Sequence, residues 1–185
     1  MRMPRARAVL LATGSLLLGL LGAGGALAIG QSAEATLRDT SGATVGKVKL
    51  TQVGGAVLVR ADIRGVSPGF HGFHVHAVGE CTPPFTSAGG HYNPDATAHG
   101  DHAGDMPSLL VMDDGSASIR FETDGFTVTE LFDADRSAII VHAGRDNFAN
   151  IPTRYHSHTE DVFGPDSATL ATGDAGGRLA CGVIE

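Results

Sequence analysis

The sequence predicts an all-β protein, either a β-sandwich or a closed antiparallel barrel. Eight short segments alternate between apolar and polar residues or are continuously apolar, and turn signals separate them. After residue 30 the chain has no amphipathic run long enough to predict a helix. The 185 residues include 26 Gly and no Trp, which fits one domain rich in turns.

The first 28 residues have the pattern of an export signal. Three arginines within the first seven residues precede the apolar run "AVLLATGSLLLGLLGAGGALA", whose last three residues form a small-x-small cleavage pattern. We therefore expect a signal peptide over 1–28 and a mature domain over 29–185, secreted or associated with the cell envelope. An uncleaved membrane anchor is the alternative, and only then do we expect contact with a membrane.

The charge of the mature part argues against nucleic acid as a partner. Residues 29–185 carry 10 basic and 20 acidic side chains, a formal charge of −10. A surface this acidic repels a phosphate backbone.

The expected strands follow one another with turns or long loops between them. Asp114 and Gly115 form a good hairpin turn between the fifth and sixth strands. Residues 79–107 and 144–177 interrupt the pattern, and long loops in a compact β domain are usually functional. The predicted strands span residues 32–39, 44–52, 56–64, 72–78, 108–113, 117–123, 137–143 and 179–184.

The fourth predicted strand contains the motif H-x-H. Alternate side chains of a strand point to the same face, so Phe73 and Val75 would face the core. His74 and His76 would then stand side by side on the outer wall, where two neutral imidazoles make half of a transition-metal site. An ordinary exposed strand is the alternative for this motif alone.

Further metal-binding side chains gather in the first long loop. In the stretch "HYNPDATAHGDHAGD", three imidazoles and one of the carboxylates can complete a tetrahedral zinc site; these residues are His91, His99, His102 and Asp105. His142, at the end of an apolar strand, offers a third imidazole to His74 and His76 for a second metal. His91 could serve both metals through its two nitrogens. Each histidine taken alone could be a surface loop residue.

The chain has two cysteines, Cys81 and Cys181. In an exported protein one disulfide is the simplest account, and two free thiols are the alternative. The bond would close a loop of about 100 residues, for which chain entropy suggests a stabilisation of roughly 4–5 kcal/mol.

Five stretches of this sequence resemble the copper/zinc superoxide dismutase family, in the family's order. They are "GFHGFHVH" (69–76), "SAGGHYNP" (87–94), "HAGD" (102–105), "IIVHAGRDN" (139–147) and "TGDAGGRLACGVI" (172–184). The resemblance implies an eight-stranded antiparallel Greek-key β-barrel with two long functional loops. It implies dismutation of superoxide anion to oxygen and hydrogen peroxide, with protection against superoxide outside the cytoplasm. A homodimer is also possible, since members of the family differ in oligomeric state.

The resemblance also assigns roles to individual residues. It implies copper bound by His74, His76, His91 and His142, and zinc bound by His91, His99, His102 and Asp105. His91 would bridge the two metals and also carry a proton, and Arg178 would guide the anion. Asp146 would orient ligands of both metals, and His71 would brace loops. Cys81 and Cys181 would form the family disulfide.

Two features depart from the family pattern or leave alternatives open. Only two residues separate His99 from His102, a shorter loop than in the animal enzymes. The second long loop contains another H-x-H, His156 and His158, which is either solvated or a labile copper-capture site. A copper-binding or copper-delivery protein of the same fold is the alternative function, but such a protein would not need Arg178.

Overall fold

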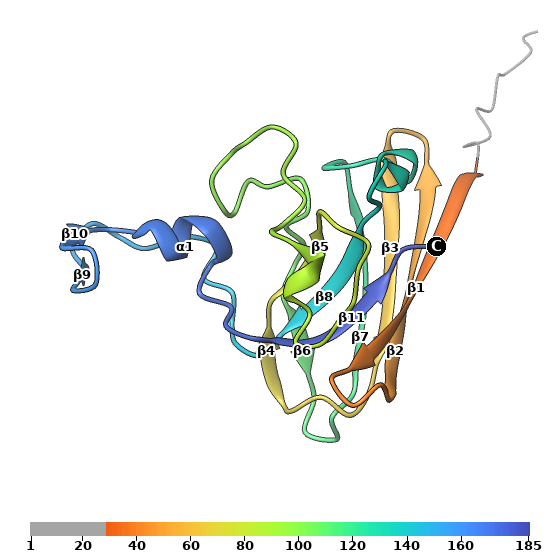
Figure 1. Ribbon diagram of the computed structural model, residues 1–185, viewed down its shortest axis with the longest axis horizontal. Coiled ribbons are helices and arrows are strands. Elements are labelled where there is room, and N and C mark those ends of the chain that lie inside the picture. The colour runs from red at the N-terminus through yellow and green to blue at the C-terminus, as the bar shows by residue number, and fades with distance from the viewer. Residues whose placement is uncertain (1–28) are drawn as a thin grey trace, which may run out of the picture.

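The computed structural model describes residues 29–185, so the predicted signal peptide lies outside the described residues. Seven antiparallel strands form the main sheet, in the order β5-β8-β11-β1-β2-β3-β7 (Figure 1). Their bounds are β1 Ile29–Asp39, β2 Thr44–Val53, β3 Ala56–Ile63, β5 Phe73–His76, β7 Ala117–Thr123, β8 Ala138–His142 and β11 Arg178–Val183. The prediction of an all-β, antiparallel fold is confirmed.

The core lies on one face of this sheet because the strands alternate as predicted. In β3, Val57 and Val59 are fully buried, whereas Arg60 and Asp62 face solvent. β2 buries Val48 and Leu50 in the same manner. This period of two is what a half-buried strand requires, since successive side chains point to opposite faces.

The remaining elements are short. Two small sheets pair β4 (Gly69–His71) with β6 (Leu109–Val111) and β9 (His156–Ser157) with β10 (Val162–Phe163). Two 3₁₀ turns cover Thr86–Ala88 and Thr129–Phe132, and one short helix, α1, covers Ser167–Thr172. None of the helices in the described part of the chain is both long and apolar enough to span a membrane.

The segment 69–76 shows where the sheet departs from a single eight-stranded barrel. It divides at Gly72, so that β4 pairs with β6 while β5 pairs with β8. Gly72 itself bonds to the end of β8 and the residues after it: its N–H donates to Gly144 O at 2.9 Å, and its carbonyl accepts from His142 N at 2.8 Å. The eight-stranded Greek-key closure therefore stays a prediction.

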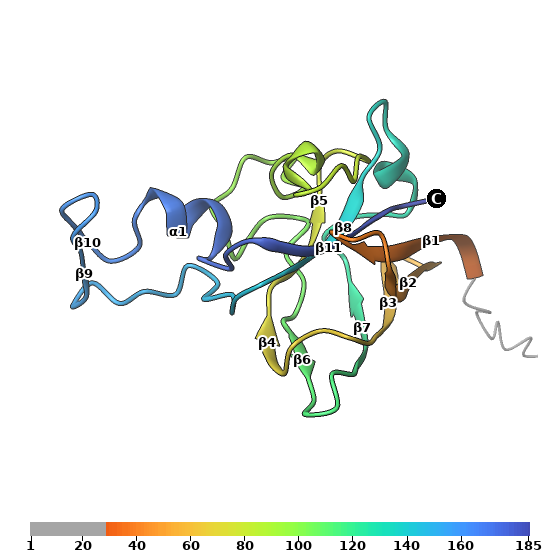
Figure 2. The same cartoon turned by 60° about the horizontal axis from the view of Figure 1, so that its bottom comes forward.

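The two long loops flank the sheet near β5, β8 and β11. The second one projects beyond the main sheet as an extension that carries β9, β10 and α1 (Figures 1 and 2). The first one is joined to β11 by the disulfide Cys81–Cys181, whose Cα atoms lie 5.6 Å apart. The expected disulfide is thus present.

Candidate metal centre

The two histidines of β5 lie on the face opposite the core and are fully buried, so the alternative of an ordinary exposed strand is wrong. Phe73 and Val75 do face the core, as predicted. On the opposite face the first long loop returns over the strand, and isolated bridges join His74 to Asp105 and His76 to His91. The face that alternation would leave to solvent is therefore covered by chain from elsewhere.

One four-histidine group forms at this covered face. Its ligand nitrogens all lie within 4.8 Å of one another, and its members are His74, His76, His91 and His142. The Nε2 atoms of His76 and His142 are 3.3 Å apart, and the rings of His74 and His91 have centroids 4.0 Å apart. The opposite nitrogens of two rings are held by main-chain carbonyls: His76 Nδ1 contacts Gly89 O and His142 Nδ1 contacts Gly176 O.

A second group shares His91 with the first. Its ligand atoms also lie within 4.8 Å, and its members are His91, His99, His102 and Asp105. His91 Nδ1 lies 2.9 Å from Asp105 Oδ1, and His102 Nδ1 lies 3.3 Å from His91 Nδ1. His91 thus presents Nδ1 to this group and Nε2 to the other.

The short spacing between His99 and His102 brings both rings into this group. The loop makes a tight turn in which the N–H groups of Gly100 and His102 both donate to Asp105 Oδ2. Gly100 has φ +94°, a conformation that glycine adopts without strain. One carboxylate therefore holds the turn with Oδ2 while its Oδ1 faces His91.

Three buried ring nitrogens show that the two groups suit metal ions. His74 Nδ1, His91 Nε2 and His99 Nδ1 are shielded from solvent and accept or donate no hydrogen bond. A buried polar atom without a partner is costly, and each of these atoms points into a ligand group. A cation with nitrogen and oxygen ligands, such as copper or zinc, would satisfy all three.

Asp146 connects the two groups. Its Oδ2 lies 2.6 Å from His74 Nε2 and its Oδ1 lies 2.7 Å from His99 Nε2. Burial alone would raise the pKa of this carboxyl, but the hydrogen bonds from the two rings outweigh it and hold the pKa well below its usual range. A carboxylate that accepts Nε2–H from each ring leaves both Nδ1 atoms free for metal.

Gly173 is a functional residue to which the sequence analysis gave no role. Its φ is +61°, and a Cβ there would collide with Asp146 Oδ1 and His99 Nε2. The only signal was its place in the stretch "TGDAGG". The contact between Asp146 and His99 needs a residue without a side chain at this position.

The pKa values in the four-histidine group favour the neutral, metal-binding form of histidine. Burial, with a smaller contribution from His74, lowers the pKa of His142 to about 3. Burial and the neighbouring His91 likewise hold the pKa of His76 well below its usual value. Neutral imidazole is the form that binds metal, so little proton release opposes binding here.

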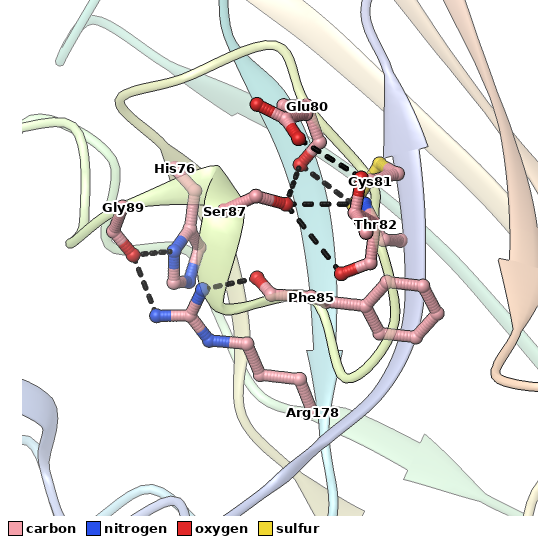
Figure 3. The surroundings of a disulfide bond; sticks show 9 residues. His76, Glu80, Cys81, Thr82, Phe85, Ser87, Gly89 and Arg178 are labelled. Carbon is pink, nitrogen blue, oxygen red and sulfur yellow. Dashed lines mark hydrogen bonds between the residues drawn. A yellow bond between two sulfur atoms is a disulfide. The ribbon is translucent and has the colours of Figure 1, made fainter.

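Arg178 lies at the rim of the four-histidine group. It is the register partner of His142 across β8 and β11, and its guanidinium donates to Phe85 O and Gly89 O (Figure 3). Gly89 O is also the carbonyl contacted by His76 Nδ1. The arginine is therefore fixed by the same loop that positions a metal ligand, and burial lowers its pKa.

Three other predicted residues, all histidines, lie outside both groups. His71 braces neighbouring segments, with Nδ1 2.8 Å from His142 O and Nε2 2.8 Å from Ser67 O. His156 and His158 lie on the projecting extension (Figure 1). All seven predicted metal ligands come together, and which metal each group holds stays a prediction.

Comparison with known proteins agrees with this geometry. Residues 44–184 match the family model described as copper/zinc superoxide dismutase. The chain is 43% identical to "Superoxide dismutase [Cu-Zn]" of Mycobacterium tuberculosis over 168 residues, covering 83% of this chain and 70% of that protein. It is 33% identical to "Superoxide dismutase [Cu-Zn] 2" of Aquifex aeolicus, covering 82% and 85%.

A solved structure, that of Cu/Zn superoxide dismutase from Brucella abortus, superposes with a TM-score of 0.64 at 29% identity and covers 84% of this chain and all of that one. The family model spans most of the described residues, and the two ligand groups lie within it. This chain therefore belongs to the copper/zinc superoxide dismutase family.

Proposed function

We propose that the protein dismutates superoxide with copper held by His74, His76, His91 and His142, while zinc is held by His91, His99, His102 and Asp105. The single observation that carries this proposal is the sharing of His91 by two complete four-ligand groups. Family membership and the names of the relatives support the reaction.

Copper, when bound, supplies one-electron redox chemistry, so that two superoxide anions and two protons give oxygen and hydrogen peroxide. The protein's own part includes handling a proton. His91 Nε2 is buried and has no hydrogen-bond partner, so it can hold a proton and give it to the reduced oxygen species. Its Nδ1 is oriented meanwhile by Asp105.

Arg178 supplies the positive charge that draws the anion in. A guanidinium stays cationic and has five donors, of which the Phe85 and Gly89 carbonyls use two. The remaining donors are free for a small anion beside the copper ligands.

Metal analysis of the purified protein, together with a dismutation assay, tests this function. We expect comparable amounts of copper and zinc. We also expect activity that a chelator removes and that copper, but not zinc alone, restores. A protein that holds both metals and does not dismutate superoxide would instead be a copper-binding or copper-delivery member of the family.

We also propose that residues 1–28 direct export of the protein and that it works outside the cytoplasm. The arginines and apolar run of that segment support this, as does the disulfide, because such bonds persist in oxidising compartments. Mass measurement of protein recovered from the cell envelope and the medium tests it. An N-terminus at residue 29 is expected, and an intact segment would identify an anchor.

A further inference from the structure

The second H-x-H motif lies on the projecting extension, apart from both ligand groups (Figures 1 and 2). His156 is half-buried and His158 is exposed. β9 and β10 form a short hairpin in which Phe163 is the partner of His156 and Val162 that of Ser157. This hairpin brings Asp161 back beside His156.

The contact between His156 and Asp161 has the geometry of two neighbouring ligands of one metal. His156 Nε2 lies 2.9 Å from Asp161 Oδ1. Nitrogen and oxygen ligands bonded at roughly 2.0–2.2 Å and meeting at a right angle are about 3 Å apart. The same separation, 2.9 Å, occurs between His91 and Asp105 in the second buried group.

The two imidazoles are also spaced as metal ligands are. The ring centroids of His156 and His158 lie 4.9 Å apart with the rings tilted by 70°. In the four-histidine group the rings of His74 and His142 are likewise 4.9 Å apart, tilted by 60°. An ordinary surface ion pair would explain the His156–Asp161 contact. It gives no reason for the ring of His158 to lie 4.9 Å from that of His156.

The hairpin holds part of this arrangement in place. Phe163 packs edge-on against the His156 ring, with centroids 4.7 Å apart, and Asp161 is held at φ +55° by the turn. The three ligand atoms do not all lie within 4.8 Å of one another as those of the buried groups do. Since His156 and Asp161 are already in contact, His158 is the member that has to move. Rotation of this exposed side chain would close the group.

We propose that His156, His158 and Asp161 form an exchangeable copper(II) site on the surface of the extension. Imidazole and carboxylate ligands bind copper(II) more tightly than the other common divalent metals, and an open site with two nitrogens and one oxygen suits its geometry. The site is exposed and has three protein ligands, so it binds more weakly than the buried groups. It stands whether or not the protein dismutates superoxide.

Copper(II) titration of the metal-loaded protein tests the site. With both buried groups filled, we expect one further equivalent of copper(II), whose electron paramagnetic resonance spectrum shows coupling to two nitrogens. His156→Ala and His158→Ala should each weaken this binding by at least about tenfold, the lower end of what loss of an outer partner costs at a metal site. Zinc(II) should bind the same site less tightly.

Two further variants make the assignment specific. Asp161→Asn, which tolerates the positive φ, should weaken binding, whereas Glu160→Gln should not, because Glu160 bonds to Ser167 instead. Dismutation should be unaffected in all four variants, which separates this proposal from the proposed function. The proposal is overturned if the loaded protein takes up no further copper or if the histidine variants bind it as the parent does.

Discussion

At the scale of single residues, the site depends on atoms that bind no metal. Arg178 and Gly173 both act through the loops that hold the ligands: the first donates to two loop carbonyls, and the second makes room for Asp146 against His99. Each can be changed without removing a ligand.

Replacing Arg178 should lower turnover through charge. Electrostatic steering raises association rates by roughly 10–10³-fold, and we expect Arg178→Ala to cut turnover about tenfold with both metals retained. Arg178→Lys should keep much of the activity because the charge survives, and Arg178→Glu should be worse than Ala. Pulse radiolysis at several salt concentrations measures this, and parent rates in all three variants with full copper would exclude Arg178 as the guide.

Replacing Gly173 by Ala should weaken metal binding without touching a ligand. A Cβ would push Asp146 away from His99, so we expect zinc and copper affinity to fall by about 10–100-fold, as when an outer partner is lost. Gly65→Ala is the matched control, since Gly65 also has a positive φ, +74°, and a Cβ there meets nothing within 4 Å. Competition with a chelator measures both. Equal affinities in the two variants would show that the Asp146–His99 contact is dispensable.

At the scale of elements, alternation predicted β2, β3 and β7 because one face of each lies on the core. It also placed Phe73 and Val75 of β5 on the core. It did not show that a later loop covers the other face of β5, because no local pattern reveals such a long-range contact. It also missed α1, a helix of six residues that is too short for periodicity to show. Its start depends on a local cap, in which the side chain of Asp166 accepts from Thr169 N.

The ligand residues were predictable because their spacing carries the chemistry, whereas their surroundings were not. Nothing in the sequence indicates that Gly89 O is shared by His76 and Arg178, or that one turn around Asp105 allows the short His99–His102 spacing. These contacts use main-chain atoms, which every residue type possesses.

The disulfide is an element-scale feature with a testable effect. Arg178 donates hydrogen bonds to the carbonyls of Phe85 and Gly89, in the turn that follows Cys81. Cys181, the other half of the disulfide, follows Arg178 by three residues on β11. Reduction should therefore loosen the turn and the arginine together and cost roughly 2–5 kcal/mol of stability. Thermal melting and hydrogen exchange at residues 85–89 measure this, and an unchanged melt with fully reduced thiols would contradict it.

At the scale of the whole molecule, the described domain carries a formal charge of −10 and yet is proposed to bind an anion. Screening resolves this, because the Debye length is about 8 Å at physiological salt. Over that distance Arg178 and the metals outweigh acidic residues elsewhere on the surface.

Global stability of the metal-free protein should be greatest near neutral pH. His142 stays neutral in the fold, with a pKa lowered to about 3 by burial and by His74, so the unfolded chain binds more protons below about pH 6.5 and acid destabilises. For His99, burial lowers the pKa, but the nearby carboxylates of Asp105 and Asp146 outweigh burial and raise the pKa to about 9. The stability that His99 contributes is complete below about pH 6.5 and is lost as pH rises through about 9.

Urea unfolding at acidic, neutral and alkaline pH measures this dependence. The metal-loaded protein is the control, because a metal-bound His99 no longer needs its extra proton and the alkaline loss should disappear. Metal-free protein of constant stability from about pH 4 to about pH 10 would show that these two histidines titrate alike in the folded and unfolded chains.

The carboxylate of Asp146, which touches one ring of each group, makes the protein sensitive to the balance of two metals rather than to either alone. We expect that filling one group orders His91 and Asp146 for the other, so that each metal raises the affinity for its neighbour; thermodynamic reciprocity makes the two factors equal. A cell short of copper would therefore also see this protein retain zinc less tightly, by the same factor by which scarce zinc weakens its hold on copper.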